Sequence, residues 1–168
     1  MAQLQSVLDN LILQFEGYFD IEKPHAYGDR VVLAYAHFTQ RMEKYVLVHR
    51  SKLYATESNE HVFFVHDRRL DEATWEAEKS FITQAERDYV IPHSEHMYSY
   101  MSLVLLCESI DDKVKKLIKR FSFTRNYRFT LHGYSTVRVA ALDLSDETIV
   151  TNRRGKGMKK VLENALHM

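Results

Sequence analysis

Residues 98–108 read YSYMSLVLLCE, and this stretch decides the fold. From Leu103 to Cys107 every side chain is apolar, so both alternating faces of an extended segment carry hydrophobic groups. A strand that is buried on both faces belongs in the centre of a sheet with cover on each side. We therefore expect this strand to lie between two layers of helices.

Two helices are predicted before this strand. Apolar residues recur every three or four positions from Leu4 to Phe15, which indicates an amphipathic helix that Gly17 ends. Asp71 has the features of an N-cap residue, and the helix that it begins should run to about Tyr89.

Two helices are also predicted after the central strand. The run Ser109–Asp112 resembles a capping box before a short and very basic helix. The last helix follows Gly155-Lys156-Gly157 and carries its apolar residues on one face.

The remaining strands are predicted from runs of alternating Val, Tyr, Phe and Leu. We expect a loop at 18–28, strands near 31–40, 44–56 and 61–67 with turns at 41–43 and 57–60, and strands at 125–134, 137–144 and 148–152. The order is α-βββ-α-β-α-βββ-α. With 168 residues and no linker-like segment, the sequence predicts a single α+β domain over residues 1–168 with a mixed sheet of about seven strands and helices on both faces.

The order α-βββ-α-β over residues 4–108 is similar to the core of the restriction-endonuclease-like superfamily. That resemblance implies a divalent metal held by an Asp in the second strand and by an (Asp/Glu)-x-Lys motif in the third. Here the second strand offers His49, Arg50 and Lys52, and the third reads HVFFVHD, so the motif is missing.

Three short segments also resemble an uncharacterised bacterial family of unknown function: Tyr45-Val46-Leu47-Val48, residues 96–100 and residues 151–156. This second resemblance implies no activity and no roles for individual residues.

Several classes of protein are excluded or disfavoured by what the sequence lacks. Cys107 is the only cysteine, so a disulfide framework and a multi-cysteine zinc or redox site are excluded. The two common glycine-rich phosphate-binding motifs are missing, and we expect no cofactor. No apolar run approaches the ~18 residues that span a bilayer and no export signal precedes the first helix, so we expect a cytoplasmic protein without a membrane contact.

Charge is distributed unevenly along the chain. Residues 112–168 hold 13 basic and 5 acidic side chains, whereas residues 1–111 hold 10 basic and 18 acidic ones. The basic part either forms a surface that attracts an anionic partner or pairs with the acidic part in the folded domain.

Two basic clusters contain the candidate anion-binding residues. The first spans Lys113–Arg128, and in it Arg125 and Arg128 alternate with aromatic residues. Single-stranded nucleic-acid sites use this mixture, although the alternation favours burial of the rings. The second holds four candidates, Arg153, Arg154, Lys156 and Lys159, at the predicted start of the last helix. The alternative is that Gly155 and Gly157 only turn the chain while the lysines lie on the solvated side of that helix.

His93 and His96 are the weak metal candidates, because two imidazoles and the carboxylate of Glu95 lie within four residues. In extended backbone the two rings diverge, and the segment is then only a polar approach to the central strand.

Three functions remain open at this point. The first is a non-enzymatic module that binds nucleic acid or an acidic protein through the basic surface. The second is a metal-dependent phosphodiesterase or nuclease with a degenerate motif, which requires Glu16, Glu57 and Asp67 to share an ion position. The third is a homo-oligomeric structural or interaction protein.

Overall fold

The structure is a computed structural model that describes residues 2–46 and 51–168, with side chains described for 3–43 and 55–168. In this part of the chain the elements run in the order α1 (Ala2–Phe15), β1 (Asp20–Glu22), β2 (His25–Tyr27), β3 (Arg30–Val32), β4 (Ala34–Val46), β5 (Ser51–Leu70), α2 (Glu72–Tyr89), β6 (His96–Ile110), α3 (Asp112–Arg120), β7 (Thr124–Asn126), β8 (Tyr134–Asp143), β9 (Thr148–Thr151) and α4 (Met158–His167).

Seven strands form one mixed sheet in the order β1-β4-β5-β6-β8-β7, with β9 also paired to β8, while β2 and β3 form a separate hairpin. The central strand β6 pairs in parallel with β5 on one side and with β8 on the other. The other pairs are antiparallel. The prediction of one α+β domain with a mixed sheet of about seven strands is confirmed.

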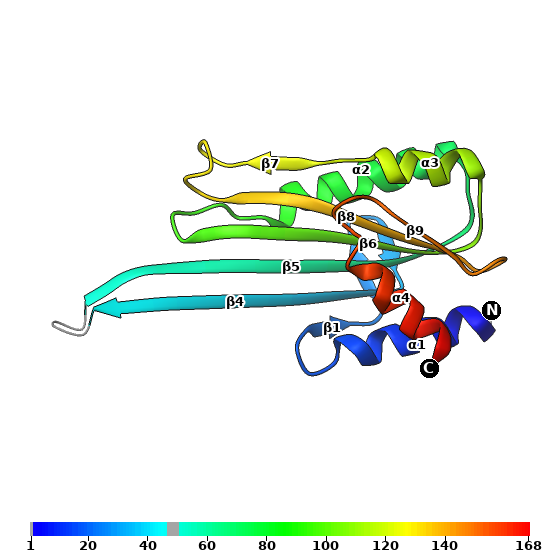
Figure 1. Ribbon diagram of the computed structural model, residues 1–168, viewed down its shortest axis with the longest axis horizontal. Coiled ribbons are helices and arrows are strands. Elements are labelled where there is room, and N and C mark those ends of the chain that lie inside the picture. The colour runs from blue at the N-terminus through cyan, green and yellow to red at the C-terminus, as the bar shows by residue number, and fades with distance from the viewer. Residues whose placement is uncertain (1, 47–50) are drawn as a thin grey trace.

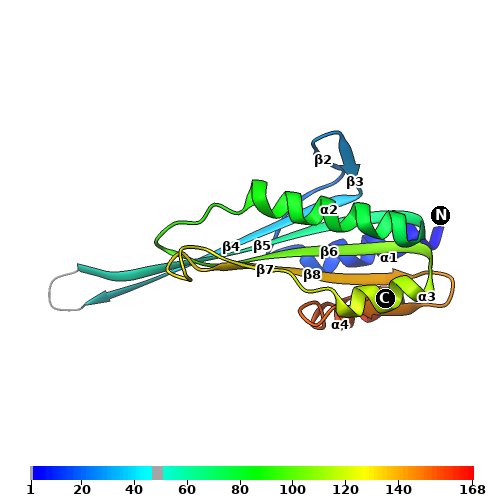
Figure 2. The same cartoon turned by 90° about the horizontal axis from the view of Figure 1, so that it is seen from above.

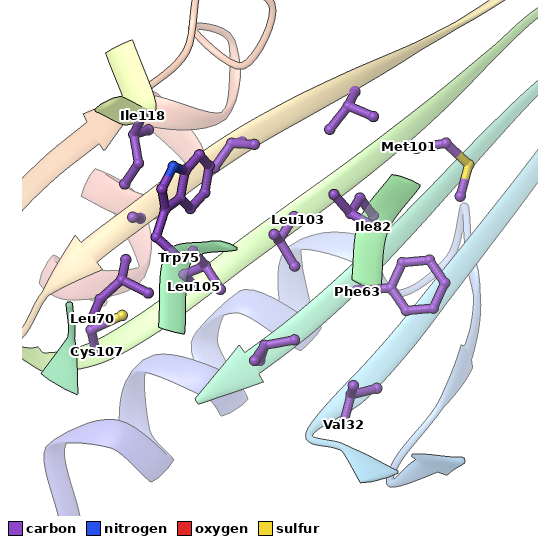
Figure 3. Close-up of a cluster of buried hydrophobic side chains, with 14 of the residues drawn as sticks. Val32, Phe63, Leu70, Trp75, Ile82, Met101, Leu103, Leu105, Cys107 and Ile118 are labelled. Atoms are coloured by element: carbon purple, nitrogen blue, oxygen red, sulfur yellow. The ribbon is translucent and has the colours of Figure 1, made fainter. Parts of the chain in front are cut away.

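Helices cover both faces of this sheet, because β6 is apolar on both faces. Side chains of α2 and α3 pack on one face around Trp75, and Figure 3 shows the Trp75 ring near Ile118 of α3 and Leu105 of β6. Side chains of α1 and α4 pack on the other face, where Val104 and Leu106 of β6 point. Figure 2 shows α2 and the β2–β3 hairpin on one side of the sheet and α4 on the other.

α1 and α4 pack against each other on their shared face of the sheet (Figure 1). The amide of Asn10 donates a hydrogen bond of 2.8 Å to the carbonyl of Ala165, and the amide of Gln14 donates one of 3.0 Å to the carbonyl of Val161. Two polar side chains of α1 therefore fix the position of α4.

The helix predictions are confirmed with one exception. α1 ends two residues before Gly17, and the Asp71 side chain accepts a hydrogen bond of 2.9 Å from the backbone N–H of Thr74 at the start of α2. The predicted capping box over Ser109–Asp112 is wrong, because Ser109 lies within β6 and Asp111 precedes α3 without a side-chain cap bond. The Asp111 carboxylate instead binds Arg69 at 3.0 Å. Among the described residues, no helix is both long and apolar enough to cross a bilayer.

The predicted bounds of the first strands are wrong. β1 and β2 lie within the expected loop at 18–28, and β3 pairs with β2 outside the main sheet. The ladder of β4 and β5 continues through both expected turns, at 41–43 and 57–60, and forms a hairpin that extends beyond the helices (Figures 1 and 2). Residues 47–50, within the strand expected at 44–56, lie outside the described residues.

Polar residues in this hairpin explain the error. Arg41 lies opposite Glu57 in the ladder, and its guanidinium lies 3.9 Å from the Glu57 carboxylate and 2.7 Å from the carboxylate of Glu95. Residues that resemble a turn are here strand positions, and Arg41 and Glu57 form an ion pair between the neighbouring strands β4 and β5.

The strand expected at 125–134 is also wrong. β7 ends at Asn126, because Arg128, Phe129 and Thr130 have positive φ angles of 45°, 55° and 73° that an extended strand does not adopt. Tyr127 packs against the core as expected, whereas Phe129 is 97% exposed.

Gly133, at the end of this loop, provides a test of the fold. Its φ is +72°, and a Cβ atom there would lie 2.3 Å from the carbonyl oxygen of Met97. Gly133→Ala should lower the free energy of unfolding by about 3 kcal/mol or more, because it combines left-handed strain with a backbone clash. Gly28 has φ +58° and no neighbour within 4 Å of its Cβ position, so Gly28→Ala should cost only about 1 kcal/mol. Urea denaturation measures both values, and equal losses would contradict the clash.

Candidate anion-binding site

The segment between β9 and α4 is held by the side chain of Asn152, which is fully buried. Its Oδ1 accepts hydrogen bonds from the backbone N–H groups of Val139, at 3.0 Å, and Gly155, at 2.8 Å. Its Nδ2 donates to the carbonyl oxygens of Val137 and Phe121 at 3.1 and 3.3 Å. One amide thus joins β8, the end of α3 and the 153–157 loop.

Gly155 allows the loop to approach the sheet closely. A Cβ atom at this position would lie 2.3 Å from the carbonyl oxygen of Val139 and 2.9 Å from Oδ1 of Asn152. Packing therefore requires the glycine. Its close contact with β8 fixes the backbone of the segment that carries the four candidate cations.

The side chains of these four cations line two separate hollows. Arg153, Lys156 and Lys159 line a hollow of about 640 Å³, which we call the basic hollow. Its full lining is Lys119, Ile149, Thr151, Arg153, Lys156 and Lys159. Arg154 instead lines a separate cavity between α1 and α4.

Lys119 belongs to the first basic cluster of the sequence, on α3, yet it lines the basic hollow with residues of the second cluster. The two clusters therefore meet on one surface. Sequence reasoning did not select Lys119, because its neighbourhood depends on how α3 lies beside β9.

The basic hollow carries uncompensated positive charge. Within the described residues, Lys119, Arg153 and Lys156 form no ion pair, and Lys159 pairs only with Glu163 on its own helix, at 3.6 Å. Elsewhere the two halves of the chain do pair. Ion pairs that join them are Lys113 with Glu72, Arg125 with Glu86 and Arg138 with Glu60.

Arg125 and Arg128, the other two anion candidates, lie elsewhere. The guanidinium of Arg125 is 3.4 Å from the carboxylate of Glu86, which is buried and also accepts hydrogen bonds from Tyr127 and Ser135. Arg125 therefore compensates a buried charge. Arg128 lies in the left-handed loop after β7 and does not line the basic hollow.

The two weak metal candidates, His93 and His96, contact different partners. Both ring nitrogens of His96 are in hydrogen bonds, Nδ1 with the carbonyl of His132 at 2.7 Å and Nε2 with Ser99 at 2.8 Å. His93 instead lies 3.4 Å from the carboxylate of Glu57. The structure therefore gives them separate hydrogen-bonding roles.

The metal-site hypothesis for Glu16, Glu57 and Asp67 does not fit the structure. Glu57 and Asp67 lie ten residues apart in the continuous strand β5, which separates them by roughly 33 Å, and Glu16 follows the end of α1. Across residues 2–46 and 51–168, no group of three or more His, Cys, Asp or Glu side chains is arranged to hold a metal ion.

A polar hollow of about 420 Å³ lies on the α2 face of the sheet, and sequence reasoning missed it. It is lined by His37, Thr39, Glu57, Asn59, His61, Tyr89, Ile91 and His93. His37 and His61 stack with ring centroids 4.5 Å apart because they lie directly opposite in the β4–β5 ladder. Predicting this contact needs the strand register, which the predicted turns at 41–43 and 57–60 did not provide.

Comparison with known proteins gives a family but no activity. Residues 3–164 match the family described as Domain of unknown function (DUF8052). No curated protein matches the chain.

Asn152 provides a test of how the site is held. Asn152→Ala leaves the buried N–H of Val139 without its acceptor, so the free energy of unfolding should fall by about 2 kcal/mol or more. Asn126→Ala, at an exposed asparagine in β7, is the matched control and should cost less than about 0.5 kcal/mol. Urea denaturation of the two variants makes the comparison, and equal stability would contradict the role assigned to the amide.

His61 predicts a pH dependence of stability. Burial, aided by the neighbouring His37, lowers the pKa of His61 to about 3, while an unfolded histidine titrates near 6.5. Between these values the unfolded chain binds more protons than the folded chain, so His61 lowers the free energy of unfolding as the pH falls below about 6.5. The slope contributed is at most about 1.4 kcal/mol per pH unit.

His61→Gln should flatten this slope between pH 6.5 and 4.5, because the new side chain does not titrate but can still hydrogen-bond to Tyr35. His167→Gln, at an exposed position of α4, is the control. Urea denaturation at several pH values measures the slopes. An unchanged slope in His61→Gln would contradict the assignment.

Proposed function

Because the chain belongs to the family of unknown function DUF8052, we propose its function from its geometry: the domain binds nucleic acid through phosphate contacts in the basic hollow. The observation that carries the proposal is that Lys119, Arg153, Lys156 and Lys159, from α3, the 153–157 loop and α4, line one concave surface. Three of these cations have no ion pair in the described part of the chain. Cations that neutralise phosphates release condensed counterions, which supplies most of non-specific nucleic-acid affinity.

The lining favours a phosphate backbone over an acidic protein. Besides its four cations, the lining described for the basic hollow consists of Ile149 and Thr151 and includes no aromatic residue. Protein interfaces depend on buried aromatic and arginine anchors, whereas phosphate contacts need only positioned cations and backbone N–H groups. The described lining holds no carboxylate or imidazole, so we propose binding and not cleavage.

The order of main-sheet elements up to β6 gives additional support, because it resembles that of a superfamily of nucleases. In the main sheet this order is α1, β1, β4, β5, α2 and β6. This resemblance supports nucleic acid as the class of partner and implies no catalytic activity.

Removal of two cations tests the proposal. Fluorescence anisotropy with a labelled 20-nucleotide single strand and a 20-base-pair duplex, at 50 and 200 mM NaCl, measures affinity and its salt dependence. Wild type should bind at least one of them, and more tightly at low salt. The double variant Arg153→Ala/Lys156→Ala should bind roughly tenfold or more weakly, with the salt slope reduced by about 2, because two phosphate contacts are lost.

The matched control is Lys79→Ala/Lys113→Ala, which removes the same charge from lysines that pair with Glu76 and Glu72. This control should bind like wild type. Absence of binding at 50 mM NaCl, or equal weakening in both double variants, would overturn the proposal. Displacement of the labelled DNA by polyglutamate as effectively as by unlabelled DNA would instead identify an acidic protein as the partner.

A further inference from the structure

A second cavity, of about 580 Å³, lies between α1, α4 and the sheet, and Arg154 points to its role. Its lining is Gln14, Phe15, Phe19, Glu60, Arg138, Arg154, Gly157, Met158 and Val161. We call it the interhelix cavity. It shares no residue with the basic hollow, so an inference about it does not rest on the proposed function.

The walls of the interhelix cavity are apolar and come from opposite sides. Phe15 ends α1 and Phe19 follows it, while Met158 and Val161 come from the first turn of α4. Phe15 and Phe19 are held edge to face, with ring centroids 4.9 Å apart. The hydrogen bond from Gln14 to the carbonyl of Val161 fixes the two helices at the cavity, so its walls are formed before any ligand enters.

The floor of the cavity is a fixed ion pair on the sheet. Nη1 of Arg138, on β8, lies 2.9 Å from the carboxylate of Glu60, on β5. The Arg138 guanidinium also stacks on the ring of Tyr100, on β6, with its central carbon 3.4 Å from the ring centroid. Arginine has five N–H donors, and the described hydrogen bonds of Arg138 use Nη1 alone. Donors of Arg138 therefore remain for a ligand.

Charge in the cavity is net positive. Glu60 compensates the charge of Arg138, and burial raises the pKa of that carboxyl group. Arg154, at the rim, is exposed and forms no ion pair among the described residues. An anion would therefore gain more in this cavity than a neutral or cationic molecule of the same shape.

We propose that the interhelix cavity binds a small organic anion, with an apolar body between Phe15, Phe19, Met158 and Val161 and an acidic group toward Arg154 and Arg138. The volume lies within the range of small-molecule sites, and such sites combine apolar walls with a few placed polar groups. The class includes carboxylates, sulfonates and phosphate esters that carry an aliphatic or aromatic group.

The probe for this site is 8-anilinonaphthalene-1-sulfonate, an apolar anion whose fluorescence rises in apolar surroundings. Wild type should bind one equivalent in a saturable manner. Arg154→Ala should raise the dissociation constant about fivefold or more, because it removes the rim cation. Arg153→Ala removes the same charge from the adjacent residue, which lines the basic hollow, and should leave the dissociation constant within twofold of wild type.

Gly157→Leu tests the position of the site without removing charge. Gly157 lines the cavity, its φ of −63° suits any L-residue, and a Cβ atom there meets nothing within 4 Å. The variant should keep its thermal stability and lose at least tenfold in affinity for the probe, because the new side chain occupies the cavity. A thermal melt confirms folding.

Competition tests the requirement for an acidic group: decanoate should displace the probe at concentrations at least fivefold lower than decanol. The proposal is overturned by unchanged probe binding in Arg154→Ala or in folded Gly157→Leu, or by equal displacement by decanoate and decanol. Nucleic-acid binding should follow the reverse pattern, weakened by Arg153→Ala and unaffected by Gly157→Leu, so failure of one proposal is distinguishable from failure of the other.

Discussion

The fold depends on the parallel pairing of β6 with both β5 and β8. Crossovers between parallel strands leave the sheet plane, so α2 connects β5 to β6 and α3 lies between β6 and β8, and both pack on the same face. The opposite face of β6 is equally apolar and needs its own cover. α1 and α4, from distant parts of the sequence, provide that cover together. Four helices are thus a consequence of one strand.

Both candidate sites lie at boundaries between the elements that cover the sheet. The basic hollow lies where α3, β9 and the start of α4 meet, and the interhelix cavity lies between α1, α4 and the sheet. Asn152 determines which cations reach which site, because it anchors the loop that places Arg153 and Arg154 on different sides. The electrostatic character of two surfaces therefore depends on one buried amide.

The features that the sequence predicts correctly are the ones with local causes. The N-cap Asp71 and the doubly apolar segment Leu103–Cys107 act within a few residues, so their patterns are visible in one dimension. Arg41 resembles a turn residue in the sequence, because its ion-pair partners Glu57 and Glu95 are distant along the chain. The contact of His61 with His37 depends on strand register, and the place of Lys119 in the basic hollow depends on how α3 packs. These three contacts, of Arg41, His61 and Lys119, could not be predicted from the spacing of residues in the sequence.

The packing of α1 against α4 has a consequence for how the molecule is made. α4 follows every strand in the chain, so a ribosome completes the sheet before it completes the layer that covers the α1 face. Until α4 emerges, Val104, Leu106 and the apolar side of α1 share an incompletely covered surface. The interhelix cavity does not exist before that moment, because half of its wall is missing. A ligand of this cavity would therefore bind only after α4 has folded onto the sheet and would hold α1 and α4 together.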